Sequence, residues 1–283
     1  MTKHFLIRSL FFASARTVLL SGCVKDATNV KLPDTPPKLV VGCFISPQDT
    51  LIVVTLSRSN PIFGPAHNNS NNLLVADASV IISDGAASVV VPYNSVNERY
   101  ELPATMLTIA SGQTYSLNIS TPKGESVSAS CTVPPSNLAS LTVEFIDTAS
   151  STKRINVKWT DIPNETNYYR IFAQTVFADS FANDTAYNEM YSDNSLQNDY
   201  DKDGKEMTSK LNGYSYYTGG NGYTKIGYDF YLLNIDAEYY KYQNSLNNYT
   251  YGDPFSEPIP LYTNIKGGLG IFGAYQKFYI RYP

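Results

Sequence analysis

Apolar and polar residues alternate along much of the chain in short runs, the pattern typical of strands with one buried face. Asp84-Gly85 and Pro122-Lys123-Gly124 stand between two of these runs, where a tight turn is needed. Strands separated by turns at this spacing predict an antiparallel β-sandwich. We expect seven strands in the first part of the chain, at residues 39–45, 50–57, 78–83, 87–91, 99–102, 114–120 and 125–133.

The pair Pro134-Pro135 ends this pattern and marks a domain boundary, because proline cannot donate to a strand ladder. Alternation resumes at residues 141–146 and 155–159. Trp159 is the one tryptophan, and we expect it in the core of a second sandwich rather than at a ligand site. Beyond it, residues 178–222 are polar and too long for an ordinary loop, so we interpret them as an insertion.

A single stretch has apolar residues at helical spacing, namely Ile235, Tyr239, Tyr242 and Leu246. Asn234 or Asp236 is suited to cap the start of this helix. The predicted fold is therefore all-β, with two sandwiches and one short helix in the second. We expect an immunoglobulin-like sandwich over residues 38–134 and a fibronectin type III-like sandwich over residues 136–283.

Residues 1–22 have the features of a signal peptide, with a basic start and an apolar stretch that Arg16 interrupts. Leu20-Ser21-Gly22-Cys23 matches the bacterial lipobox, which predicts cleavage before Cys23 and acylation of its thiol. Two or three acyl chains make such an anchor durable. The alternative is a buried cysteine in a signal-like helix. Residues 23–37 contain three prolines and are expected to form an extended tether.

Composition changes this picture in two ways. The leader carries three of the 21 cations and none of the 25 acids, so the processed chain has a net charge of −7 against −4 for the whole sequence. That sign repels phosphate backbones and excludes nucleic acid as a partner. Export also implies an oxidising compartment, where two remaining thiols favour a disulfide. We expect a Cys43–Cys131 disulfide, with two buried free thiols as the alternative.

Catalytic motifs are missing from the sequence. His67 is the one histidine of the processed chain and lies in an Asn-rich stretch, without a nucleophile-elbow motif to accompany it. We therefore expect no enzyme. A hydrolase that uses two carboxylates stays open, because nothing in the sequence singles out or excludes a pair of acids.

Two segments of the second domain are candidate binding sites. Acidic residues at alternate positions before Gly204 follow the start of a calcium loop and predict a Ca²⁺ site at Asp199, Asp201 and Asp203. Lys210 takes the place of the usual bidentate glutamate, so a solvated acidic turn is the alternative. A segment rich in Tyr, Gly, Ser and Asn resembles the composition of antibody loops, which predicts ligand contacts at Tyr214, Tyr216, Tyr217 and Tyr223. Tyrosines that only pack and cover a sandwich are the alternative there.

Three stretches of the C-terminal third carry a resemblance to a known family: 235–242, 252–258 (Gly-Asp-Pro-Phe-Ser-Glu-Pro) and 264–275 (Asn-Ile-Lys-Gly-Gly-Leu-Gly-Ile-Phe-Gly-Ala-Tyr). Together with residues 39–45 and 53–59, they resemble the domain-of-unknown-function 4249 family. The resemblance implies an outer-membrane lipoprotein of Bacteroidota, commonly encoded beside TonB-dependent receptors. It implies no reaction and no binding residues.

These observations favour a non-enzymatic accessory that is lipid-anchored at the outer membrane. Exposure at the cell surface and anchoring in the inner leaflet are both open. We expect the accessory to associate with a TonB-dependent receptor and to bind a glycan or a peptide through the second domain. The alternatives are a glycosidase-like surface hydrolase and an adhesin or envelope spacer with no small ligand. Fold alone does not decide among them, because sandwiches host many functions.

Overall fold

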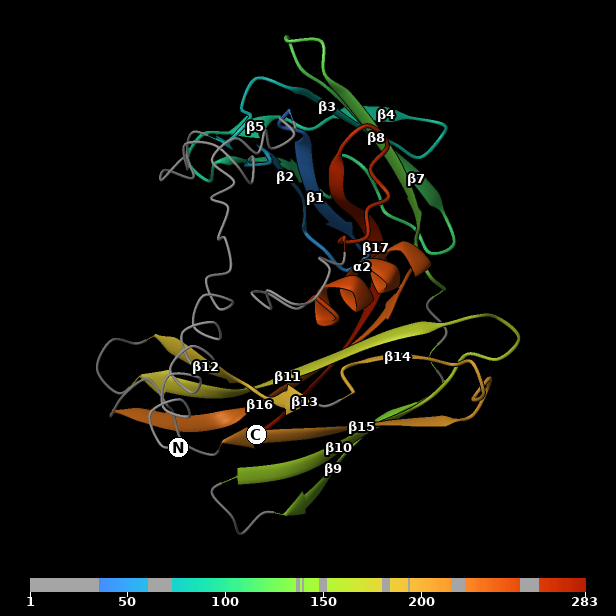
Figure 1. Ribbon diagram of the computed structural model, residues 1–283. Coiled ribbons are helices and arrows are strands. Elements are labelled where there is room, and N and C mark those ends of the chain that lie inside the picture. The colour runs from blue at the N-terminus through green and yellow to red at the C-terminus, as the bar shows by residue number, and fades with distance from the viewer. Residues whose placement is uncertain are drawn as a thin grey trace, which may run out of the picture. The chain divides into compact units, whose positions relative to one another are not determined.

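The computed structural model describes residues 36–60, 73–135, 138, 140–147, 152–179, 184–192, 194–214, 222–249 and 260–283 (Figure 1). Strands dominate this part of the chain, and it contains one α-helix, α2 (Ala237–Asn247). The predicted all-β fold with one short helix is confirmed. The predicted signal peptide, Cys23, most of the tether and His67 lie outside the described residues. No helix among the described residues is long and apolar enough to cross a membrane.

The first sandwich encloses a core that both of its sheets supply. One sheet contains β1 (Leu39–Ile45), β2 (Leu51–Arg58), β5 (Tyr93–Asn94) and β6 (Arg99–Pro103). The facing sheet has the order β4 (Ser88–Val90), β3 (Ser79–Ser83), β7 (Thr114–Ser120) and β8 (Ser126–Thr132). Burial alternates along β7, where Tyr115, Leu117 and Ile119 are buried, because only one face of the strand meets the core. Each of the seven predicted strands corresponds to one of these elements, and β5 is additional.

The second sandwich is built around Trp159. One sheet has the order β13 (Tyr191–Ser192), β15 (Glu206–Tyr214), β10 (Thr152–Thr160) and β9 (Leu141–Asp147). The other contains β12 (Thr185–Glu189), β11 (Tyr168–Asp179), β14 (Leu196–Asn198), β16 (Tyr223–Ile235) and β17 (Leu269–Tyr282). Trp159 is fully buried and meets the Tyr169 ring edge to face at 5.4 Å, so it is a core residue as predicted.

The polar segment predicted as an insertion contributes strands to the second sandwich. All of β12, β13, β14 and β15 lie within residues 178–222. β15 pairs along its length with β10, which brings Met207 and Leu211 into the core beside Trp159. Polar residues dominate the composition because the edge strands and turns of this region face solvent. That composition hid the few buried positions.

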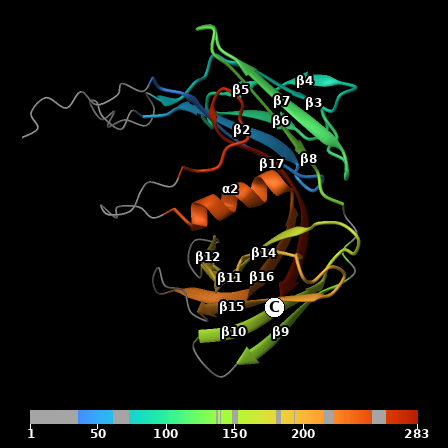
Figure 2. The same cartoon turned by 45° about the vertical axis from the view of Figure 1, so that its right-hand side comes forward.

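The strand β17 belongs to both sandwiches (Figures 1 and 2). Its first half pairs in parallel with β1, and its second half pairs antiparallel with β16. One sheet therefore continues from the first sandwich into the second. Ile265, Phe272 and Ala274 complete the core of the first sandwich, so residues 38–134 do not enclose that core by themselves.

Helix α2 lies against β17 and β11 and begins after Asp236, one of the two predicted caps. The Asp236 side chain accepts the backbone N–H of Tyr239 at 2.7 Å, which satisfies one of the free donors of the first turn. Tyr239 is buried and its ring lies 4.3 Å from that of Phe44 in β1. Of the predicted apolar stripe, Ile235 is buried but is the last residue of β16. Within the helix Tyr239 is buried and Leu246 is exposed.

The predicted disulfide is not formed. Cys43 in β1 and Cys131 in β8 are both buried, from facing sheets of the first sandwich, and both are free thiols. Burial raises the pKa of each thiol, and the negative charges of Asp49 and Asp236 add to the shift at Cys43 and Cys131 respectively. The two cysteines act as small apolar residues of the core, which is the alternative stated for them above. The alternation of buried positions puts both side chains in the core and cannot tell free thiols from a disulfide.

Candidate functional site

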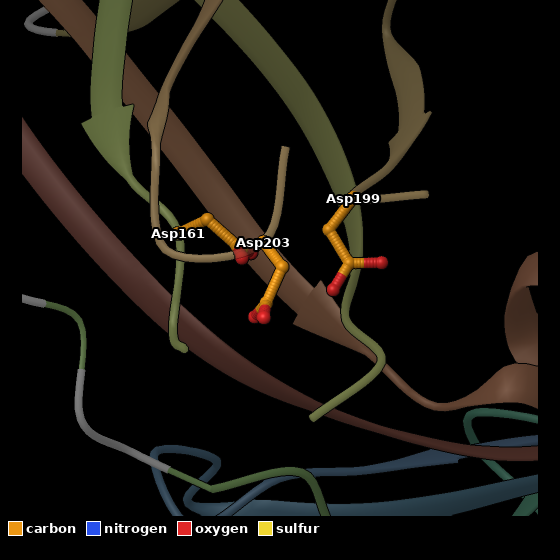
Figure 3. A group of neighbouring side chains, drawn as sticks. All are labelled: Asp161, Asp199 and Asp203. Atoms are coloured by element: carbon orange, nitrogen blue, oxygen red, sulfur yellow. The ribbon is translucent and has the colours of Figure 1, made fainter. Parts of the chain in front are cut away.

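Three aspartates gather where β10 ends and where the turn before β15 begins (Figure 3). Asp161, Asp199 and Asp203 each place one carboxylate oxygen within 4.8 Å of the others. The pairing of β10 with β15 explains this arrangement, because Asp161 donates its backbone N–H to Lys205 at 2.9 Å and so holds the turn beside it. Asp161 therefore joins two of the three predicted ligands, and Asp201 is not part of the group.

Each of these carboxylates accepts a hydrogen bond from the protein. Asp161 accepts the Tyr169 hydroxyl at 2.8 Å and the Gly204 N–H at 2.9 Å. Asp199 accepts the Asn167 N–H at 2.9 Å, and Asp203 accepts the Asn164 N–H at 2.8 Å. Burial, with a contribution from the charge of Asp199, raises the pKa of Asp161. The cluster thus clamps two turns together.

A hollow of about 410 Å³ reaches two of the cluster's acids, Asp199 and Asp203. Carboxylate oxygens are the ligands that Ca²⁺ prefers, but calcium takes six to eight of them. The three carboxylates already accept hydrogen bonds, so water would have to supply many of the oxygen ligands of a bound Ca²⁺. The hydrogen bonds of its carboxylates account for the cluster as a structural clamp, and the calcium site stays a prediction.

The predicted tyrosine contacts fall mostly outside the described residues. Tyr216 and Tyr217 lie there, as does the side chain of Tyr214, while Tyr223 is half-buried at the start of β16. The structure instead brings together an aromatic surface that sequence reasoning missed. Its members are far apart along the chain, so no local pattern could reveal them.

This surface, the aromatic face, is formed by Phe172, Tyr231 and Tyr279 on the outer side of β11, β16 and β17. The strand register places these residues directly opposite one another. The rings of Phe172 and Tyr231 are stacked, with centroids 4.5 Å apart and planes 10° apart. The centroids of Tyr231 and Tyr279 are 5.1 Å apart. Phe172 and Tyr279, at the ends of the row, are 39% and 47% exposed.

A buried carboxylate holds one side of the aromatic face. Asp229 is 4% exposed, accepts the Tyr279 hydroxyl at 2.7 Å and accepts the side-chain amide of Gln174 at 3.4 Å. The Arg281 guanidinium lies 3.8 Å from the same carboxylate. Asp229, on β16, therefore fixes the orientation of polar groups on the two neighbouring strands, β11 and β17.

On the other side of the row, Arg170 donates a hydrogen bond to the Tyr239 hydroxyl at 2.7 Å. Two hollows meet at Arg170 and Phe172, which line both. The inner hollow has a volume of about 440 Å³ and is also lined by Tyr231, Tyr239 and Lys277. The outer hollow has a volume of about 680 Å³ and is also lined by Glu189, Tyr191 and Asn247. Both volumes lie in the range of small-molecule sites.

A larger, polar cavity of about 840 Å³ lies between β8 and the start of α2. Its acids are Asp236 and Glu238. Burial raises the pKa of Asp236 to about 7, although its carboxylate accepts the N–H groups of Tyr239 and Ala274. Burial opposes the ionisation of Glu238, but hydrogen bonds from Tyr262 and Lys241 lower its pKa overall. Both carboxylates are thus bound to protein donors.

The fold and these sites define the chain as an all-β sandwich protein with an organised aromatic surface. The family described as "Domain of unknown function (DUF4249)" matches residues 25–281 of the 283 residues, and the chain belongs to this family. The predicted family resemblance is confirmed. A search of curated proteins finds no match.

Proposed function

We propose that the chain is a lipoprotein, anchored at the outer membrane by acylated Cys23, and that it is a non-enzymatic binding accessory. Its contact surface in this proposal is the aromatic face. The observation that carries the proposal is the exposed row Phe172–Tyr231–Tyr279, held in place by the buried Asp229. Rigid aromatic side chains lose little conformational entropy on binding and dominate the energy of many interfaces.

The location and the partner rest on sequence. The lipobox at Leu20–Cys23 supports the anchor, and the family resemblance supports association with a TonB-dependent receptor. The immunoglobulin-like and fibronectin type III-like assignments of the two sandwiches are part of the same proposal. They are supported by the strand spacing and by the buried Trp159 between two sheets.

Membrane fractionation tests the anchor. Wild-type protein is expected in the outer-membrane fraction with a labelled acyl chain. Cys23→Ala is expected to carry no label and to be absent from that fraction. Co-purification from membranes solubilised in detergent tests the accessory role. Wild type is expected to recover a receptor or a ligand and Tyr231→Ala to recover less than a tenth as much. Tyr200→Ala is the matched control because Tyr200 is 94% exposed outside the aromatic face.

A carboxylate-dependent hydrolase is the second candidate, and one observation favours it. Asp236 and Glu238 share the polar cavity, and the pKa of Asp236 is raised toward neutrality as a general acid requires. The hydrogen bonds that already engage both carboxylates weigh against this function. Glycoside hydrolysis by wild type that is lost in Glu238→Gln would establish the hydrolase and contradict the non-enzymatic proposal.

A further inference from the structure

The two ends of the aromatic row have exposed ring surface. Tyr231 lies between two other rings, so both of its faces are partly covered. Phe172 and Tyr279 each have one neighbour in the row and keep more of their surface exposed. Phe172 also lines both hollows. Flat aromatic surface of this kind packs well against the C–H groups on the face of a sugar ring.

The polar groups beside these rings have the complementary chemistry. Arg170 has a planar fork of N–H donors and is oriented by the Tyr239 hydroxyl. Gln174 lines the inner hollow and carries both a donor and an acceptor, while Glu189 and Asn247 extend this set in the outer hollow. Planar side chains that offer two polar atoms match pairs of adjacent hydroxyl groups. Sugars carry such pairs at the edge of the ring.

Charge on the aromatic face favours a neutral ligand. Lys277 lies 3.8 Å from Asp49, and Arg281 lies 3.8 Å from Asp229. Arg170 and Glu189 both line the outer hollow. These six residues are three cations and three acids, so the aromatic face as a whole gives a charged ligand no net attraction. The described lining of the inner hollow contains two of the cations, Arg170 and Lys277, and no acid, but Lys277 lies beside Asp49. Aromatic and polar side chains also outnumber aliphatic ones in both hollows, which disfavours a purely apolar ligand.

We propose that the aromatic face binds a neutral oligosaccharide, with Phe172 as the wall shared by two adjoining sugar subsites in the inner and outer hollows. This inference rests on the proposed function and names its ligand class. The two hollows, with volumes of about 440 and 680 Å³, suit successive sugar units rather than the flat contact area of a protein partner.

Isothermal titration of the full processed lipoprotein tests the proposal, in a detergent that has no sugar headgroup. The probes are the tetrasaccharides of glucose (α- and β-linked), xylose and mannose, with oligogalacturonate as the anionic comparison. At least one neutral probe is expected to bind, and more tightly than oligogalacturonate. Phe172→Ala and Arg170→Gln are expected to weaken that binding about tenfold or more. Tyr200→Ala is expected to bind within about twofold of wild type.

Three results would overturn this inference. They are the absence of binding by every neutral probe, tighter binding of oligogalacturonate, and binding that Phe172→Ala leaves unchanged. Thermal melting of each variant separates loss of the site from loss of the fold. If Tyr231→Ala abolishes co-purification of a receptor while no oligosaccharide binds, the sugar ligand is wrong and the accessory function stands. If neither is observed, both fail.

Discussion

The carboxylate of Asp236 accepts the backbone N–H of Ala274 at 3.1 Å and so joins the start of α2 to the strand that both sandwiches share. Its other oxygen caps α2 through Tyr239. One buried acid therefore holds the helix against β17, beside the inner hollow that Tyr239 lines. The position of α2 and the shape of the proposed binding surface depend on this contact.

Asp236 makes folding stability depend on pH. Its pKa rises from 3.8 to about 7 on folding, so the native state binds a proton more tightly than the unfolded chain. Its contribution to stability is complete below pH 4 and is lost as the pH rises through 7. Urea unfolding gives the unfolding free energy of wild type and of Asp236→Asn at each pH. The difference, wild type minus variant, is expected to fall by up to about 1.4 kcal/mol per pH unit in that window. A difference that does not change with pH, or one that matches the exposed control Asp201→Asn, contradicts this assignment.

The aspartate cluster makes a second prediction about stability. Asp161→Ala leaves the Tyr169 hydroxyl and the Gly204 N–H without their acceptor, and it is expected to cost about 2 kcal/mol or more. Asp201→Ala removes an exposed acid outside the cluster and is expected to cost less than about 0.5 kcal/mol. Urea unfolding measures both changes. Equal costs would mean that the clamp is not a structural unit.

Calcium is tested on the same cluster. A Ca²⁺ site there predicts that added Ca²⁺ raises the melting temperature of wild type and of Asp201→Asn, and that Asp161→Asn abolishes the increase. The sequence alone predicted Asp201 as a calcium ligand and did not include Asp161. Melting temperatures that neither Ca²⁺ nor a chelator changes in any of the three proteins would show the calcium prediction to be wrong.

The parallel pairing of β1 with β17 depends on Gly270. Its φ is +103°, and a Cβ atom would lie 1.9 Å from the carbonyl oxygen of Val41. Gly270→Ala is therefore expected to cost about 3 kcal/mol or more in unfolding free energy. Gly112 is the matched control, because its φ of +74° is similarly unusual but the space around it is open. Gly112→Ala is expected to cost about 1 kcal/mol. Similar losses in the two variants would contradict the close approach.

The two cysteines are expected to react only after unfolding. Cys43 and Cys131 are buried, and burial raises the pKa of both thiols, so the native chain is expected to resist a thiol reagent at neutral pH. Unfolding without a reductant should expose two reactive thiols per processed chain. If no thiol reacts until a reductant is added, the disulfide predicted from the sequence exists after all.

The sequence predicted local structure well because a strand's burial pattern is local. Alternation predicted a strand at residues 114–120, and the structure forms β7 there with Tyr115, Leu117 and Ile119 buried on one face. Alternation does not say which strands pair, however. It could not show that Phe272 and Ala274 near the C-terminus fill the first core.

The candidate sites were harder to predict for the same reason. Asp161 joins the acidic cluster through strand pairing, and Phe172 meets Tyr231 and Tyr279 through cross-strand register. Each of these residues is unremarkable within its own segment. The Tyr-rich segment that ends at Tyr223 was predicted to contact a ligand because its tyrosines lie close together in the sequence. A high frequency of one residue type in a segment describes only its composition. A site depends on which strands pair with one another.

The structure of the processed chain with its preferred neutral oligosaccharide bound tests the central claim most directly. The account predicts one sugar ring against Phe172 in each hollow, with Arg170 in hydrogen-bond contact with the ligand. Sugar in the polar cavity beside Asp236 and Glu238, with the aromatic face unoccupied, would contradict it.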